Sequence, residues 1–163
     1  MNVTLLKVTK KEKDIFKNIF QFFAYDFSEM NGMNVEENGI FLLPNDIDSY
    51  YTEPNYNSFF ILVDNKMADV AIIKNISEEN INYLRHFFVM RKYRRLRIGQ
   101  SAVHMLLDMF HGKWRVSQFD YNKSAISFWR RVIEKYTNGD YIEMRRVDGK
   151  GLQQEFYSTK FKK

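Results

Sequence analysis

Five positively charged residues fall within one short segment of the chain: Arg91, Lys92, Arg94, Arg95 and Arg97. An apolar run precedes them and ends at Val89, and apolar residues recur at helical spacing after Gly99. The order is therefore strand, basic loop, helix. The first backbone N–H groups of a helix lack intrahelical partners, and the helix dipole favours negative charge beside them. The segment predicts a cradle for a diphosphate-like anion with arginines around it.

Gly99 fits this prediction, because a residue without a side chain lets the backbone approach phosphate oxygens closely. Two simpler interpretations stay open for the same residues. The cluster could be a solvated basic turn, or a nucleic-acid-binding module could use the Arg91–Arg97 cluster. A nucleic-acid interface more often repeats its basic residues along one face or interleaves them with exposed aromatic residues. Nucleic acid is therefore the less favoured partner.

Composition removes several kinds of chemistry. The 163-residue chain has no cysteine, which excludes disulfides, thiolate metal sites and cysteine nucleophiles. The three histidines, His86, His104 and His111, are too scattered to predict a zinc site, so no metal is expected. The formal net charge of +5 suits a polyanionic ligand but does not select one.

The elements that must position the basic loop can be predicted from hydrophobic spacing. Residues 2–8 alternate like a strand, and Thr9 with Glu12 forms a capping-box pattern at the start of a helix. The buried face of that helix is predicted to consist of Ile15, Phe16, Ile19, Phe20 and Phe23. Residues 33–57 are mainly loops, with a short strand near 40–43.

The rest of the chain predicts a sheet with further helices. Strands are expected at 58–63, 67–73, 81–89 and 114–119, and two late strands at 141–147 and 153–161 are joined by a hairpin at 148–151. One helix follows Gly99 and ends at Gly112, and another carries apolar residues from Ala125 to Tyr136. This order predicts a single domain over residues 1–163, of the α/β or α+β class, with helices packed on one sheet.

The basic loop resembles a motif of the GNAT acetyltransferases. That family carries R/Q-x-x-G-x-G/A between a strand and a helix, and Arg94-Arg95-Leu96-Arg97-Ile98-Gly99 is similar to it. The resemblance continues beyond the motif, because Asn122 follows the next strand and the aromatic pair Phe128-Trp129 lies on the next helix. It implies a mixed, mostly antiparallel sheet of about six to seven strands flanked by about four helices.

The resemblance also implies acetyl-CoA as co-substrate and an unidentified primary amine as acceptor. It places the cofactor on residues of the strand, loop and helices just described: Phe88, Val89, Arg94, Arg95, Leu96, Arg97, Ile98, Gly99, Gln100, Ser101, Asn122, Phe128 and Trp129. Other roles stay open for some of them. Asn122 could instead be a helix N-cap, and the two aromatic residues could belong to the core.

Two positions depart from the family pattern. Arg97 stands where the motif usually has its first glycine, and it can do so only at negative φ or at a cost in strain. Trp129 stands where the family often has a tyrosine that protonates the departing thiolate. An indole N–H cannot fill that role.

His86 is the candidate base, because a half-exposed histidine near the strand end could take a proton from the ammonium group of the acceptor. A purely structural histidine is the alternative. Glu29, Glu36 and Glu37 lie in the region where the family shapes its acceptor pocket, without a basis for choosing among them.

The sequence therefore predicts an N-acetyltransferase that transfers the acetyl group directly to an amine, with a backbone N–H near Val89 polarising the thioester carbonyl. A non-catalytic acyl-CoA-binding domain is the alternative suggested by Trp129. A cytoplasmic protein without membrane association is expected, since neither a signal peptide nor a long apolar run is found. Whether the protein forms a homodimer stays open.

Overall fold

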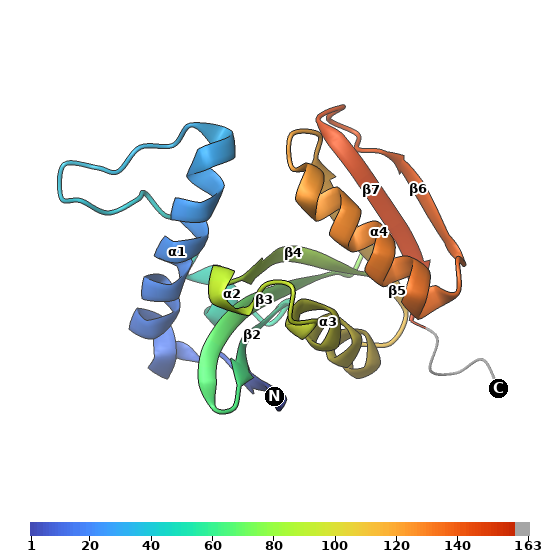
Figure 1. The fold of residues 1–163 in the computed structure, drawn as a ribbon, viewed down its shortest axis with the longest axis horizontal. Helices are drawn as coiled ribbons and strands as arrows, with labels where there is room; N and C mark the ends of the chain where they lie inside the picture. Colours follow the sequence, from blue (N-terminus) through green and yellow to red (C-terminus); the bar gives the residue numbers. More distant parts are fainter. Residues whose placement is uncertain (159–163) are drawn as a thin grey trace.

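A computed structural model describes residues 1–158 of the chain, Asp69 by its backbone alone. Its centre is a seven-stranded sheet in the order β1-β2-β3-β4-β5-β7-β6 (Figure 1). The strands are β1 (Val3–Lys7), β2 (Tyr56–Val63), β3 (Lys66–Ile76), β4 (Ile81–Val89), β5 (Lys113–Phe119), β6 (Tyr141–Arg145) and β7 (Gly151–Tyr157). Only the pairing of β4 with β5 is parallel among the described strands. The predicted mixed, mostly antiparallel α+β fold is confirmed.

Four α-helices pack on this sheet within the part of the chain that is described: α1 (Lys13–Asn31), α2 (Ser49–Thr52), α3 (Ile98–Met109) and α4 (Lys123–Thr137). Short 3-10 turns, η1 (Lys10–Glu12) and η2 (Arg91–Tyr93), precede α1 and α3. The predicted capping box is present, since the backbone N–H of Thr9 donates to Glu12 at 2.9 Å. It caps η1, and α1 follows directly and ends at Gly32 in the left-handed conformation.

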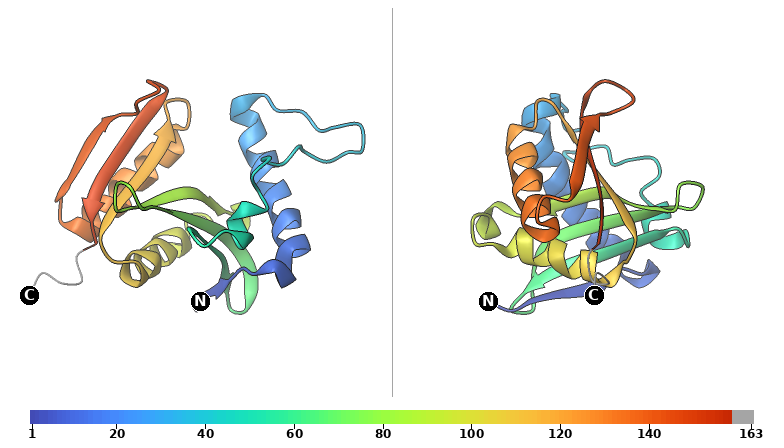
Figure 2. Two further views of the ribbon diagram at one scale, coloured as in Figure 1. Left: turned by 180° about the vertical axis from the view of Figure 1, so that it is seen from behind. Right: turned by 90° about the vertical axis from the view of Figure 1, so that its right-hand side faces the viewer.

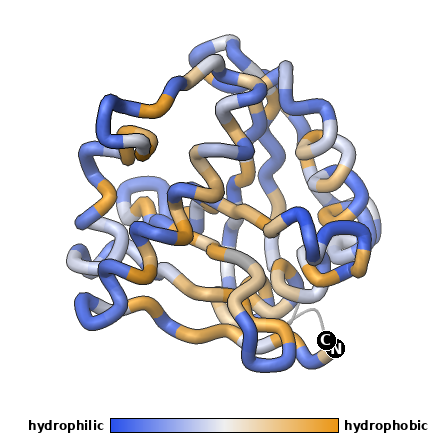
Figure 3. Tube along the Cα trace, turned by 60° about the vertical axis from the view of Figure 1, so that its left-hand side comes forward, coloured by the Kyte–Doolittle hydropathy of each residue, from blue (hydrophilic) through white to orange (hydrophobic). Residues whose placement is uncertain are grey.

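Local turn chemistry fixes the hairpins. Asp64 and Asn65 have φ of 49° and 61°, and together they make the tight turn between β2 and β3. The predicted late hairpin is also present, with Gly149 at φ 70° and its N–H donating to the Arg146 carbonyl. Gly151, the first residue of β7, lies so close to β5 that a Cβ there would collide with the Gln118 carbonyl. Hydrophobic and hydrophilic stretches follow one another along the chain (Figure 3).

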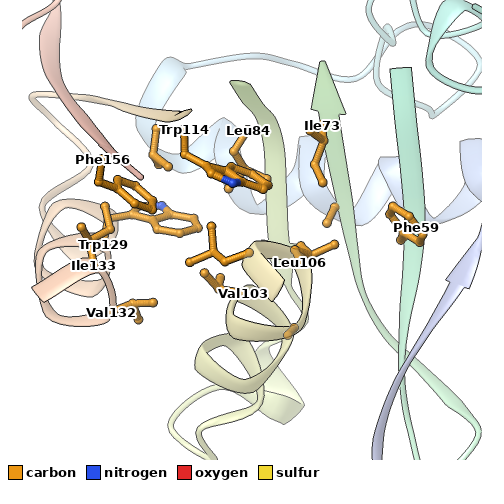
Figure 4. Close-up of a cluster of buried hydrophobic side chains, with 14 of the residues drawn as sticks. Phe59, Ile73, Leu84, Val103, Leu106, Trp114, Trp129, Val132, Ile133 and Phe156 are labelled. Carbon is orange, nitrogen blue, oxygen red and sulfur yellow. The ribbon is translucent and has the colours of Figure 1, made fainter. Parts of the chain in front are cut away.

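The two faces of the sheet carry separate cores. α3 and α4 cover one face with a cluster that includes Trp114, Trp129, Leu106 and Phe156 (Figure 4). α1 and α2 cover the other face, where Phe16, Phe20 and Tyr50 pack on residues of β2, β3 and β4. Every one of these side chains is almost fully removed from water. Their burial supplies the main driving force for this arrangement.

The feature that matters for function is the point where β4 and β5 separate. They pair only from Ile81 with Lys113 to Leu84 with Val116. Beyond these residues α1 stands on one side of the divide, and α4, β6 and β7 stand on the other (Figures 1 and 2). The carboxyl end of β4 therefore has one unpaired edge.

Several predicted details are wrong. Ile15 is 49% exposed and is not part of the buried face of α1, which consists of Phe16, Ile19, Phe20 and Ala24. The short strand expected near 40–43 is reduced to an isolated bridge between Val35 and Phe41. α2 was not predicted, and the strand expected to reach residue 147 ends at Arg145. Residues 159–161 of the last predicted strand lie outside the described residues.

Candidate functional site

A cleft of about 790 Å³ opens at the divide between β4 and β5. Its walls come from four places: α1, the end of β4, the basic loop with the first turn of α3, and α4. No single element could form such a cleft. It exists because the sheet splits where the loop and the two helices converge.

One end of the cleft is the N-terminus of α3. The first helical hydrogen bond runs from the N–H of Ser101 to the carbonyl of Arg97, so the N–H groups of residues 98–100 precede the helical ladder. Ile98, Gly99 and Gln100 line the cleft, together with Arg94, Arg95 and Arg97. The first turn of α3 and three arginines thus border the same space, and helix N–H groups with guanidinium groups are the chemistry that binds phosphate groups.

The loop reaches this position through two strained residues. Arg95 and Arg97 have φ of 63° and 62°, in the left-handed region that glycine adopts without cost. The sequence left open whether Arg97 keeps a negative φ, and it does not. A left-handed conformation costs a non-glycine residue about 1–2 kcal/mol. The fold therefore accepts strain at the residue that replaces the glycine usual in the motif.

Arg94 is tied to two neighbours. Its Nε donates to the Val89 carbonyl at 2.8 Å, and its Nη2 donates to Asp26 of α1 at 2.5 Å. Arg91 donates to the other oxygen of Asp26 at 2.8 Å. Burial by itself would raise the pKa of Asp26, but the hydrogen bonds from Arg94 and Arg91 outweigh it and lower the pKa. Asp26 is therefore ionised, and its ion pairs with Arg91 and Arg94 connect α1 to the basic loop.

Gly99 has a different neighbourhood from the one expected. A Cβ on Gly99 would lie 3.2 Å from Cζ of Phe128 and 3.3 Å from a methyl group of Val89. These distances are shorter than ordinary van der Waals contacts. A side chain here would press on Phe128 and Val89, so Gly99 suits the close packing of α3 between β4 and α4. The sequence pattern suggested close approach of phosphate as the reason for the glycine.

The opposite wall of the cleft is α4. Asn122 lines the cleft and also caps this helix, its Oδ1 accepting from the N–H of Ala125 at 3.1 Å. Phe128 stacks on Phe87 of β4 at 6.0 Å between ring centroids. Trp129 is 6% exposed, belongs to the main core and meets Phe87 edge-on at 5.3 Å. Asn122 is therefore a helix cap and Trp129 a core residue, as the alternative interpretations proposed, and both also line the cleft.

His86 lies on the α1 face of β4 among aromatic rings. Phe20, Phe23 and Tyr50 have ring centroids 5.2, 5.3 and 5.5 Å from its own. Burial, reinforced by the charge of Arg85, lowers the pKa of His86 to about 3. An imidazole with that pKa is a weak base and is neutral at pH 7.

The hydrogen bonds of His86 also indicate a neutral imidazole. The hydroxyl of Tyr50 lies 3.1 Å from Nε2 of His86 and 3.1 Å from the Asp46 carboxylate. A carboxylate only accepts hydrogen bonds, so Tyr50 donates to Asp46 and His86 donates through Nε2 to Tyr50. His86 is also not among the described residues that line the cleft. The geometry therefore argues against His86 as the base and favours a structural role.

Most of the predicted cofactor residues converge. Eleven of them line the cleft: Phe88, Val89, Arg94, Arg95, Arg97, Ile98, Gly99, Gln100, Asn122, Phe128 and Trp129. Leu96 and Ser101 do not line it, and both are exposed. Glu29, Glu36 and Glu37 are exposed and lie outside its walls.

The wall that α1 supplies was not predicted from the sequence. Phe23, Asp26, Phe27 and Met30 line the cleft at spacings of three and four residues. Their spacing is the signal that could have found them, because it defines one helix face that continues past the core residues. The apolar stripe was assigned to the core alone.

Residues 1–158 contain no group of three or more histidine, aspartate or glutamate side chains that could hold a metal ion. None of the helices in this range is both long enough and apolar enough to cross a lipid bilayer.

Comparison with known proteins is consistent with this geometry. Solved structures with a similar fold include an acetyltransferase from Thermus thermophilus, with a TM-score of 0.73 and 14% identity over 96% of this chain and 97% of that one. The PaiA N-acetyltransferase of Thermoplasma acidophilum, solved with coenzyme A, gives 0.67 and 13% over 96% and 99%. A spermidine N-acetyltransferase chimera from Vibrio cholerae gives 0.64 and 7% over 97% and 96%.

Sequence comparison agrees at the level of the family. No curated protein matches the chain. A sequence model described as the acetyltransferase (GNAT) family matches residues 22–133, a range that runs from the middle of α1 to α4 and includes most of the cleft. The match covers more than half of the chain, and the fold agrees with it: this protein belongs to the GNAT acetyltransferase family.

Proposed function

We propose that this protein is an N-acetyltransferase that transfers the acetyl group of acetyl-CoA directly to a primary amine. The observation that supports it best is the N-terminus of α3 with Arg94, Arg95 and Arg97 at one end of a cleft that continues to the unpaired edge of β4. The diphosphate would bind at the helix N-terminus, and the thioester would lie along the edge of the strand.

The orientation of the backbone at Val89 supports this proposal. The N–H of Met90 donates to the Ala68 carbonyl on β3 at 3.0 Å. Successive peptide groups of a strand point to opposite edges, so the N–H of Val89 faces the edge from which β5 has separated. Its carbonyl faces that way too, since it accepts from Arg94. This N–H would donate to the thioester carbonyl and stabilise the oxyanion that forms on it.

The reaction balances without a covalent intermediate on the protein. The ammonium group loses a proton to water, the amine nitrogen forms a bond to the carbonyl carbon and releases a second proton to water, and the carbon–sulfur bond then breaks. The thiolate takes a proton from water, because Trp129 cannot supply one. The absence of cysteine closes a route through an acyl-cysteine.

Deprotonation of the acceptor is assigned to water in the open cleft. Asp26 is the carboxylate in the described cleft wall and is held by two arginines, and His86 is outside the wall. Under this proposal kcat/KM rises with pH toward the pKa of the acceptor amine, since only the free amine attacks.

Calorimetry with CoA and with its analogue lacking the 3′-phosphate tests the binding step. Thiol release from acetyl-CoA in the presence of a panel of primary amines tests the transfer. We expect CoA to bind, the analogue to bind more weakly, and thiol release to depend on an amine. Failure to bind CoA would contradict the proposal.

Trp129 favours one alternative, a domain that binds acyl-CoA without turnover. Binding of CoA with no thiol release on any amine would support it. A nucleic-acid role is weakened because Arg91 and Arg94 are engaged by Asp26. Strong salt-dependent binding to DNA or RNA that CoA does not displace would support that role.

A further inference from the structure

The α1 wall of the cleft is apolar and aromatic. Phe23, Phe27 and Met30 recur at intervals of four and three residues, which places them on one side of the helix, and all three line the cleft. Phe23 stacks on Phe27 with ring centroids 5.6 Å apart and planes at 12°. Phe23 also meets Phe88 of β4 edge-on at 5.9 Å. The wall is thus continuous with the strand that would present the thioester.

This wall extends across the mouth of the divide. Phe27 lies 6.2 Å from Phe119 at the end of β5 and 6.1 Å from Tyr121 in the loop that leads to α4. Phe119 and Tyr121 stack on each other at 5.1 Å with planes at 10°. Tyr121 is 46% exposed, so the row of rings runs from the cleft to the surface. A flat apolar group entering here would meet ring faces and edges on its way to β4.

The charges in the cleft do not suit an acceptor with several cationic groups. The described walls contain five cationic side chains, of which Arg94, Arg95 and Arg97 are assigned above to the diphosphate of CoA, and Arg131 and Lys135 remain. Asp26 is the carboxylate among these described lining residues, and two arginines hold it at 2.8 and 2.5 Å. The nearby Glu29 is outside the wall, 79% exposed and 3.8 Å from Arg91. A second ammonium group in the acceptor would be desolvated here without a free counter-charge.

We propose that the acceptor is a small monoamine whose amine is attached to an apolar body about the size of one aromatic ring, and that polyamines are poor acceptors. The proposal rests on the function proposed above and adds the class of acceptor. The body packs on Phe27 and Phe23, and the amine reaches the thioester at the end of β4. Only one positive charge needs to be lost, and it is lost as a proton before the attack.

The test compares kcat/KM for 2-phenylethylamine, n-butylamine and spermidine at saturating acetyl-CoA, measured by thiol release. We expect kcat/KM for 2-phenylethylamine to exceed that for n-butylamine by about 10-fold, because an apolar pocket favours the substrate that buries more apolar surface in it by at least this order. Spermidine is expected to be no better than n-butylamine. Phe27→Ala should lower kcat/KM for 2-phenylethylamine by a larger factor than kcat/KM for n-butylamine, so that the advantage is lost, while the Kd for CoA stays that of the wild type.

Phe22→Ala is the matched control, because Phe22 is on the same helix but is 54% exposed and outside the described cleft wall. It should leave the preference unchanged. Phe27→Leu keeps an apolar side chain without the ring, and provides the same comparison if the alanine variant does not fold. Loss of CoA affinity in Phe27→Ala, or an equal loss on both monoamines, would overturn the proposal.

The outcomes separate this proposal from the proposed function. A preference for spermidine over 2-phenylethylamine would overturn the acceptor assignment and leave N-acetyl transfer intact. Binding of CoA without thiol release on any amine would overturn the proposed function and the acceptor assignment together.

Discussion

Asp26 of α1 accepts a hydrogen bond at 2.5 Å from Arg94 of the basic loop, across 68 positions of sequence. One partner lies in the wall proposed for the acceptor, and the other lies in the loop proposed for the diphosphate. Arg94 also donates to the Val89 carbonyl, at the strand end where the thioester would lie. One guanidinium group thus connects three of the four walls of the cleft: α1, the end of β4 and the basic loop.

Asp26→Asn should loosen this connection. The amide keeps the shape of the carboxylate but loses its charge, so the unfolding free energy should fall by about 1 kcal/mol, a modest value because solvent screens the pair. The folded-state pKa of Asp26 is lowered, so its contribution is present above the unfolded pKa and is lost as the pH falls through the folded value. Denaturation at pH 7 and at pH 3 measures both effects. A variant that loses the same stability at both pH values would contradict the role of the charge.

Gly99→Val should destabilise the fold as well as weaken CoA binding. The added side chain would press on Phe128 and Val89, and overpacking of this kind costs about 1–3 kcal/mol. Ser101→Val is the control for stability, since Ser101 is exposed on the same helix. Thermal unfolding of the two variants provides the comparison. Equal melting temperatures would show that a larger side chain at position 99 does not destabilise the packing against Phe128.

Arg97→Gly and Arg97→Ala together separate strain from charge. Both remove the guanidinium group, so both should bind CoA more weakly in calorimetry. Only glycine adopts the left-handed conformation at φ 62° without strain. Glycine should therefore be more stable than alanine here by about 1 kcal/mol, opposite to the usual order within a helix. If alanine is the more stable of the two, the backbone at this position is not strained.

Trp129→Phe should keep most of the kcat at saturating acetyl-CoA. The indole serves as a wall and a core residue, in contact with Phe87 and Phe128, and does not act as a proton donor. Some loss of stability, about 1–3 kcal/mol, should accompany the smaller side chain. Loss of CoA affinity is expected as well. Turnover abolished with stability and CoA affinity preserved would show that the indole takes part in the chemistry.

His86→Gln should change stability rather than the pH profile of catalysis. Burial lowers the pKa of His86 to about 3, while the unfolded chain protonates near 6.5. Between these values the unfolded chain binds a proton that the folded chain does not, so stability falls as the pH falls, by at most about 1.4 kcal/mol per pH unit. The glutamine variant should lack this slope in denaturation measurements from pH 7 to pH 4. If it instead loses a limb of the kcat/KM profile between pH 6 and pH 9, His86 is the base after all.

Local sequence patterns determined much of the fold. The capping box at Thr9, the tight turn at Asp64 and Asn65 and the glycine hairpin at 148–151 depend on neighbours within a few residues. The same is true of the strand, basic loop and helix order around Arg94, because each step follows from side-chain types and their spacing. The predicted anion-binding residues come together because most of them belong to this one continuous segment.

Only the tertiary structure decided what surrounds that segment. Periodicity reports that one side of a helix is apolar, but it does not distinguish a side chain in the core from one in a cleft wall, so Phe23 was assigned to the core. Phe27 was missed because the predicted apolar face stopped at Phe23. The ion pair between Asp26 and Arg94 joins residues 68 positions apart, and no local pattern encodes that contact. The pKa of His86 likewise depends on Phe20, Phe23, Tyr50 and Arg85, which three separate elements bring to one place. Burial and long-range contacts belong to the assembled sheet, and they decided which predicted residues line the cleft.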